Sequence, residues 1–228
     1  LKSVRWWGLM TVVAAIVIGM VYGEASGSGR GRDLANRVLA APPDAVRGML
    51  AQGAPWMKWA KADLSAAAQS PISSRAGLNA RLALVPTDPS HIDPLLSAML
   101  EADARAFAAI YDTLKDIPNV HTQLFHEVLE DDQATNGRKL RAFVALANFQ
   151  RYDPALAKAD TEAARWLMTS VKDIAAWSAQ LRVIARQFSP KLEVLLATAA
   201  TEEEKRDVCM ALAGLHAEEP TVLVRLLN

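Results

Sequence analysis

The stretch that decides the fold is LRAFVALANFQRYDP, residues 140–154. Phe143, Leu146 and Phe149 recur in it at helical spacing, and small alanines lie between them. Residues three and four apart share one face of a helix, so the stretch predicts an amphipathic helix whose apolar face must be buried. A polar turn follows, and we expect the acid-proline pair Asp153-Pro154 to start the next helix.

Two other parts of the chain follow the same layout. The reference copy is Ala145-Leu146-Ala147 followed by Asp153-Pro154. About 66 residues downstream, Ala211-Leu212-Ala213 is followed by Glu219-Pro220. About 62 to 65 residues upstream, Ala83-Leu84-Val85 is followed by Asp88-Pro89. Four helices fit into one such period, which makes two helix pairs of roughly 30–35 residues, close to the unit size of helical solenoids. Stacking neighbouring pairs would bury their apolar faces in one continuous core.

The remainder of the chain from Asp33 onward predicts short helices separated by small polar turns or prolines, such as Pro42-Pro43 and Pro55. The composition favours helix because it is rich in Ala and Leu, with only 6% aromatic residues. No stretch alternates with a period of two, so we predict no sheet. The predicted fold is all-α, a superhelical solenoid of helix pairs over residues 33–228.

Near its start the chain has one uninterrupted apolar run, Trp6 to Tyr22 (WWGLMTVVAAIVIGMVY). A helix of this length covers roughly 25 Å, close to the ~30 Å hydrocarbon core of a bilayer. We predict a transmembrane helix over residues 6–22 after a short flank, residues 1–5. A cleaved signal peptide is the alternative, but the residues that follow match a cleavage site poorly. Positive charges on both sides leave the orientation open.

Residues 23–32 begin with GEASGSGRG and predict a flexible linker that lets the helical domain stand off the membrane. A phosphate-binding glycine loop would need a preceding strand or a Lys-Ser/Thr pair, and neither is present. Because the chain begins with Leu1 rather than Met, we expect it to be a piece of a longer protein.

Charge and cysteine content limit the possible functions. The chain has 25 Lys+Arg and 25 Asp+Glu, and this balance argues against a general nucleic-acid binder, which needs a basic face. The single cysteine, Cys209, lies in a helical apolar pattern. We therefore expect it to be a small buried hydrophobe rather than a reactive thiol.

Three segments carry a family resemblance: ARLALVPTDP (80–89) with Leu95-Leu96 and Met99-Leu100, LRAFVALA (140–147) with Tyr152-Asp153-Pro154, and Met210–Ala213 with Glu219-Pro220. Here the chain resembles bacterial multi-domain transmembrane proteins in which a cytoplasmic serine/threonine protein kinase precedes a membrane helix. In that family a HEAT/armadillo-like region follows the helix, often with a formylglycine-generating-enzyme-like (sulfatase-modifying) domain after it. The resemblance covers residues 6–228, the middle of such a protein.

The resemblance implies a HEAT/armadillo-like solenoid outside the cytoplasm, in the periplasm or an equivalent space. It carries over no catalytic residue, because the chain has no kinase glycine loop, no His-Arg-Asp loop and no Asp-Phe-Gly. It also has no cysteine pair of the kind that the copper site of formylglycine-generating enzymes would require.

Motifs that could carry chemistry fail on spacing. His126-Glu127-Val128-Leu129-Glu130 resembles the zinc-protease helix, but the second histidine ligand would stand at position 130, which is Glu. A calcium loop starting at Asp132 would need ligands where Ala134 and Phe143 stand. We assign no catalytic residue, cofactor or metal ligand. Thr201–Glu204 predicts a capping box instead.

Trp56 and Trp59 are the possible partner-binding residues. They are three apart on one predicted helix, beside Lys58 and Lys61, and tryptophan is enriched in binding hot spots. Packing against the preceding helix is the alternative.

The predicted function is a non-catalytic, membrane-anchored scaffold or interaction region, the extracytoplasmic part of a larger bacterial signalling or modifying protein. We expect a protein or peptide partner, and no nucleic acid or small-molecule substrate. One alternative is an enzyme fragment of kinase or sulfatase-modifying type whose catalytic domain lies outside this chain. Others are an active site assembled from scattered carboxylates and histidines, and a passive spacer.

Overall fold

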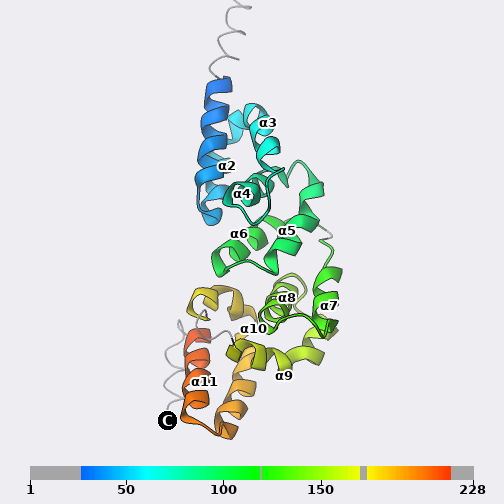
Figure 1. The fold of residues 1–228 in the computed structure, drawn as a ribbon, viewed down its shortest axis with the longest axis vertical. Helices are drawn as coiled ribbons and strands as arrows, with labels where there is room; N and C mark the ends of the chain where they lie inside the picture. The colour runs from blue at the N-terminus through cyan, green and yellow to red at the C-terminus, as the bar shows by residue number, and fades with distance from the viewer. Residues whose placement is uncertain (1–26, 119, 170–173, 217–228) are drawn as a thin grey trace, which may run out of the picture. The chain divides into compact units, whose positions relative to one another are not determined.

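The computed structural model describes residues 27–118, 120–169 and 174–216, and every regular element in these ranges is a helix (Figure 1). The all-α prediction is thereby confirmed for these residues. The chain divides into two compact units, Leu1–His91 and Ile92–Asn228. The predicted transmembrane helix over residues 6–22 lies outside the described residues. Within the described ranges, no helix combines the length and the apolar composition needed to cross a membrane.

The first unit consists of short helices, several of which begin at prolines. Its described elements are a helix over residues 27–40, η1 (Pro43–Ala45), α2 (Val46–Gly53), η2 (Ala54–Trp56), α3 (Met57–Ala67), α4 (Arg75–Leu84) and η3 (Pro89–His91). Pro43 and Pro55 lie in the first turn of η1 and η2, where a missing backbone N–H costs nothing. The helix breaks predicted at these prolines are confirmed.

The linker prediction is wrong for residues 27–32, which are helical, while residues 23–26 lie outside the described residues. Two glycines serve close packing there instead of flexibility. A Cβ on Gly27 would lie 2.4 Å from Trp59 Cζ2, and one on Gly31 would lie 2.5 Å from Trp59 Cβ. Because Gly27 and Gly31 are four residues apart, they share one helix face. They form a flat strip against which Trp59 of α3 packs.

Replacing Gly31 by alanine is expected to destabilise this packing. In an unobstructed helix, Gly→Ala stabilises by roughly 0.5–1 kcal/mol. At Gly31 the added methyl would meet the backbone of α3, since Ala60 N would be 3.0 Å away. We expect hydrogen exchange of the amides in residues 27–40 to accelerate about tenfold, as for a loss of ~1.4 kcal/mol.

Gly29→Ala is the matched control on the same helix, because a Cβ at Gly29 has no neighbour within 4 Å. This substitution should slow the exchange through the higher helix propensity of alanine. Effects of the same sign for Gly29→Ala and Gly31→Ala would contradict the described packing.

A buried asparagine fastens the C-terminal end of the helix over residues 27–40. Asn79 of α4 is completely buried, and its Nδ2 donates to the carbonyl oxygens of Val38 (2.9 Å) and Ala41 (2.8 Å). The last carbonyls of a helix have no partner within the helix, so the amide supplies donors that water cannot. Turning the amide over would place Oδ1 against two carbonyl oxygens, which explains its orientation.

Asn79→Ala is expected to lower the free energy of unfolding of the first unit by about 1–3 kcal/mol, because the Ala41 carbonyl loses its side-chain donor and the Val38 carbonyl keeps only the longer bond from the Ala41 amide (3.3 Å). Asn79→Asp should be more damaging at pH 7, since a carboxylate would face two carbonyl oxygens. Acidification should partly rescue Asn79→Asp, because a protonated carboxyl can donate a hydrogen bond. Denaturant titration followed by hydrogen exchange in residues 27–40 measures both effects. Wild-type stability of Asn79→Asp at pH 7 would contradict this role.

The second unit is organised around α8 (Figure 1). Its elements are α5 (Ile92–Met99), α6 (Ala104–Leu114), α7 (Gln123–Glu130), α8 (Asn136–Phe149), α9 (Pro154–Thr169), α10 (Ile174–Thr198) and α11 (Glu202–Leu215). α8 packs against α5, α7, α9 and α10. Residues 142–147 are each at most 1% exposed. Because a helical turn takes 3.6 residues, such a run is covered on all sides.

Aromatic rings pack around this central helix. Phe143 stacks on Phe188 of α10 with ring centroids 5.4 Å apart. Phe149, near the other end of α8, meets Tyr111 of α6 edge-on at 5.2 Å. Small residues bring the neighbouring helices close, and the rings fill the wider spaces between them.

Helices α4, α8 and α11 share one construction at positions that the sequence repeat equates. Each begins at a Ser or Thr whose hydroxyl accepts a hydrogen bond from the backbone three residues on; these caps are Ser74, Thr135 and Thr201. On α11 the predicted capping box with Glu204 is confirmed. After α4 and α8, Asp88 and Asp153 each accept a hydrogen bond from the amide two residues ahead.

The Ser90 hydroxyl, and secondarily its amide, lower the pKa of Asp88. Stabilisation from this turn is therefore present above the pKa of an unfolded aspartate and is lost as the pH falls through the lower folded value.

The next period departs from the predicted four helices. Helices α4 to α7 fill the first period, but α8, α9 and α10 fill the second. α10 is one helix of 25 residues that runs through Pro190. The sequence has no glycine between Ile174 and Thr198, so nothing apart from Pro190 favours a break there.

The prediction that Cys209 is buried is wrong, because its side chain is exposed. α11 buries Val208, Ala211, Leu212 and Leu215, which recur every three or four residues. Cys209 lies one position beyond Val208, about 100° around the helix, and so falls outside this stripe.

Candidate functional site: a pocket between α7, α8 and α9

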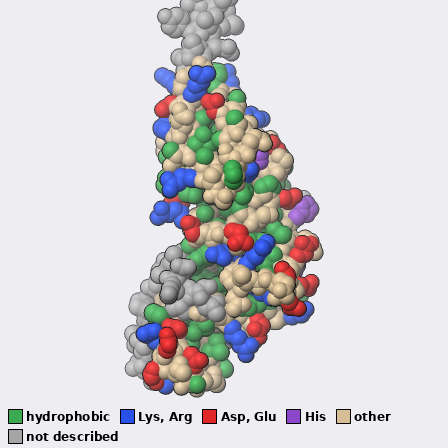
Figure 2. Space-filling model, in the orientation of Figure 1, with side chains coloured by type: hydrophobic (Ala, Val, Ile, Leu, Met, Phe, Trp, Pro, Cys, Tyr) green, Lys and Arg blue, Asp and Glu red, His purple; other side chains and the backbone are tan. Residues whose placement is uncertain are grey.

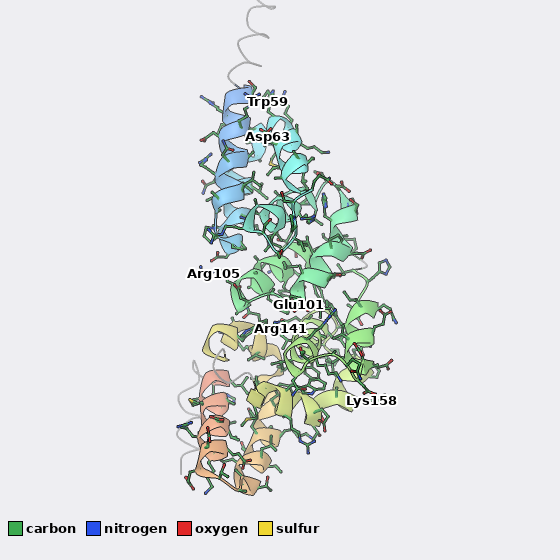
Figure 3. The ribbon with its side chains drawn as sticks, in the orientation of Figure 1. Trp59, Asp63, Glu101, Arg105, Arg141 and Lys158 are labelled. Carbon is green, nitrogen blue, oxygen red and sulfur yellow. The ribbon has the colours of Figure 1, made fainter. Side chains whose placement is uncertain are left out.

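A pocket of about 420 Å³ lies between three helices of the second unit. It is lined by His126, Leu129 and Glu130 from α7, by Asn136 and Lys139 from α8, and by Ala155, Lys158, Ala159, Glu162 and Trp166 from α9. Its volume falls within the range of small-ligand sites, roughly 300–1,000 Å³. Glu130, Lys158 and Glu162 are exposed, so the pocket opens to solvent. Figure 3 labels Lys158 on α9.

α9 contributes one continuous face of the pocket. Ala155, Ala159, Glu162 and Trp166 follow one another at intervals of three or four residues, which places them on the same side of the helix. The two alanines leave the space that forms the hollow. Trp166, only 8% exposed, also lines the hollow, and Lys139 Nζ lies 5.9 Å from the indole centroid, within range of a cation–π contact.

The charged groups of the pocket are unequally neutralised. Glu162 is bonded to Arg165 at 2.6 Å, and His126 Nε2 lies 3.2 Å from Asp153 Oδ2. Among the described residues, neither Lys139 nor Lys158 has an ion-pair partner, and Glu130 has none either. The pocket therefore holds two unpaired ammonium groups against one unpaired carboxylate. Elsewhere on the face shown in Figure 2, acidic and basic side chains are interspersed.

The pair of His126 and Asp153 connects two walls of the pocket. Asp153 lies in the turn between α8 and α9, where its Oδ1 accepts a hydrogen bond from the amide of Ala155 at 2.9 Å. Its other oxygen, Oδ2, holds His126 of α7. One carboxylate thus both caps α9 and ties the α7 wall to it. In the ranges that the structure describes, no three His, Cys, Asp or Glu side chains are grouped to hold a metal ion.

The tryptophans predicted as possible partner-binding residues lie in the first unit and are partly exposed. Trp59, labelled in Figure 3, packs on Gly27 and Gly31 and has the Lys58 ammonium 3.8 Å from its ring centroid. Trp56 lies under the Arg30 guanidinium at 5.5 Å. Both indoles therefore contact the helix over residues 27–40, as the packing alternative expects. Their role in partner binding stays a prediction.

A buried Ser–His contact is the clearest polar feature that the sequence does not signal. Ser189 Oγ of α10 lies 2.5 Å from Nε2 of His216, the C-cap residue that follows α11. The Ser189 hydroxyl also donates to the Ala185 carbonyl at 2.7 Å. A hydroxyl has a single proton, so Nε2 must carry a hydrogen and donate to Oγ. A nucleophilic serine instead donates its hydroxyl proton to an unprotonated histidine nitrogen. The contact between Ser189 and His216 therefore serves to hold α11 against α10.

Ser189→Ala is expected to destabilise the second unit by about 1–3 kcal/mol, because the buried imidazole N–H loses its acceptor. Thr198→Ala is the control on the same helix, since the exposed Thr198 hydroxyl also donates to a backbone carbonyl (2.9 Å). We expect Thr198→Ala to change the stability by less than about 0.5 kcal/mol. Hydrogen exchange in α11 distinguishes the two, and equal effects would contradict the fastening role.

Lys139 and Lys158 are the pocket residues that sequence reasoning did not single out. A usable signal existed in Ala155 and Ala159, one turn apart, with Trp166 two turns further along the same face. Such a face is compatible with a hollow bordered by an aromatic ring and equally with a close helix contact. It does not reveal which lysines border the hollow, because they come from two helices.

Comparison of the chain with protein-family models, with curated proteins and with solved structures gives no significant match. The resemblance to bacterial multi-domain transmembrane proteins therefore stays a prediction.

Proposed function

We propose that this chain is the interaction region of a larger bacterial signalling or modifying protein, a HEAT/armadillo-like solenoid anchored in the membrane by a helix over residues 6–22. The helical region lies on the extracytoplasmic side and binds a protein or peptide. It is not catalytic. A kinase or sulfatase-modifying domain, where one exists, lies outside this chain.

The observation that carries the proposal is the shared construction of α4, α8 and α11. A hydroxyl cap and a buried small-residue helix recur in all three at the spacing of the sequence repeat, and an aspartate-capped turn follows α4 and α8. Repeats of this kind bury one side of each helix against neighbours and leave an extended surface for partners. The departure at α10 is the kind of irregularity that degenerate repeats accumulate.

The chemistry of the pocket supports binding. Its unpaired cations are the ammonium groups of Lys139 and Lys158, which attract an anion but have no lone pair with which to accept a proton. The buried Ser189 donates to a backbone carbonyl and not to His216. These arrangements are suited to recognition and to packing rather than to general base catalysis.

Membrane extraction of the full chain tests the anchoring part of the proposal. Produced in a bacterial host with a C-terminal tag, the chain should stay in the membrane fraction after an alkaline carbonate wash. The double variant Val13→Arg/Ile16→Arg should release it, since each arginine costs about 2.5–3.5 kcal/mol at the centre of a membrane helix. Val4→Arg, outside the apolar run, is the control and should be retained. Carbonate release of the unaltered chain would overturn the proposal.

Protease treatment of spheroplasts tests the topology. A helical region outside the cytoplasm should be digested by added protease without lysis of the cells, together with the C-terminal tag. A cytoplasmic protein serves as the control for intact cells. Digestion that requires lysis would place the helical region inside and contradict the proposed topology.

A further inference from the structure

The unequal charges of the pocket between α7, α8 and α9 indicate the chemistry of its ligand. We propose that this pocket binds an acidic peptide segment of a partner protein. One side-chain carboxylate of the segment lies between Lys139 and Lys158, and an adjoining apolar side chain covers the alanine face of α9. The inference rests on the proposed interaction role and specifies the chemistry of the partner.

The first step of the inference is that the ligand group is an anion. Lys139 and Lys158 come from different helices, α8 and α9, and both border the same hollow. Arg165 already neutralises Glu162, at 2.6 Å. Glu130 is the remaining unpaired acid on the pocket wall, and it offsets one of the two cations. A single negative charge therefore completes the balance.

The second step is that the anion is a carboxylate. Strong phosphate sites use the fork of arginine or several backbone N–H groups, whereas the free cations here are two lysines. The two lysines and Glu130 together leave one positive charge, so a phosphate dianion would add a negative charge in excess beside Glu130, whereas a singly charged carboxylate completes the balance. A side-chain carboxylate of Asp or Glu satisfies both lysines with less repulsion.

The third step is that the carboxylate belongs to a peptide with apolar neighbours. Ala155, Ala159, Leu129 and Trp166 all border the hollow, so an isolated anion would leave apolar surface uncovered. Tyr152 is 92% exposed and precedes Asp153, which holds the pocket residue His126. An exposed aromatic side chain in the turn that leads into α9 is available to a peptide that extends beyond the pocket.

Peptide binding by the full chain tests the inference. The chain is held in nanodiscs of zwitterionic lipid, and empty nanodiscs correct for lipid binding. Three terminally blocked, fluorescein-labelled peptides serve as probes: Leu-Glu-Leu-Glu-Leu and its counterparts with Gln or Lys in place of Glu. Fluorescence anisotropy at low salt should show the Glu peptide binding at least about tenfold more tightly than the other two, and binding should weaken as salt is raised. Equal binding of the Lys peptide would overturn the inference.

Charge variants locate the binding. Lys139→Gln and Lys158→Gln should each weaken binding of the Glu peptide about threefold, and the double variant about tenfold, as expected for solvent-exposed ion pairs. Glu130→Gln should instead tighten binding about threefold. Lys205→Gln removes a lysine on α11 that is paired with Glu202 at 2.7 Å and does not line the pocket, so it should leave binding unchanged. Wild-type affinity of the double variant would overturn the inference.

Competition separates the carboxylate from other anions. Inorganic phosphate at the same ionic strength as a sodium chloride control should displace the Glu peptide no better than chloride. Preferential displacement by phosphate would overturn the choice of ligand. Vesicles that contain anionic lipid should not displace the Glu peptide from the wild-type chain. Displacement that is lost when Lys139 and Lys158 are replaced would instead assign the pocket to a lipid surface. These outcomes are independent of carbonate extraction and protease access, so failure here is distinguishable from failure of the proposed function.

Discussion

The structure of the second unit depends on one constraint: the middle of α8 is enclosed by protein on every side. A helix enclosed in this way can carry no polar side chain along its middle, and each neighbouring helix must lie at a distance that its alanines and phenylalanines set. Packed helices with small contact residues lie about 8–10 Å apart. The positions of α7 and α9 are therefore fixed by their contact with α8. The pocket is the place where the alanines of α9 fail to fill the resulting space.

Polar side chains form hydrogen bonds to unpaired backbone groups at the ends of these helices. Serine, threonine and aspartate side chains satisfy the backbone donors that each first turn leaves unpaired. Asn79 does the same for carbonyls at the far end of another helix. Asp153 shows how one such group gains a second role, since its free oxygen reaches His126 on a neighbouring helix. The connection between α7 and the start of α9 thus uses the same carboxylate that caps α9.

Local signals in the sequence predicted much of the fold and little of the site. The all-helical class, the breaks at proline and the capping box of Thr201 depend on residues close in the sequence, and these predictions were correct. The glycines before residue 32 were misread because composition is the same for a flexible linker and for a helix face that receives an indole. The burial of Cys209 was predicted wrongly, because apolar neighbours in the sequence do not determine which side of a helix faces the core.

The pocket lysines could not be predicted, because their importance comes from the ion pairs that other residues make. Arg165 forms an ion pair with Glu162, and Asp153 contacts His126. The pair of Glu162 and Arg165 follows from their i,i+3 spacing on one helix, but the pair of His126 and Asp153 joins residues 27 apart and depends on the tertiary fold. The alanines at positions 155 and 159 were visible beforehand, but an alanine pair equally well predicts a close helix contact.

The contact of Trp59 with Gly27 and Gly31 has a mechanical consequence. A coil at this point would act as a tether and absorb any movement of whatever precedes it. The helix over residues 27–40 instead spans about 20 Å as a stiff rod at 1.5 Å per residue, and the indole prevents it from turning freely against α3. A rotation or an axial displacement applied at residue 27 would therefore be transmitted along this helix to α3, because the two are packed together through Trp59.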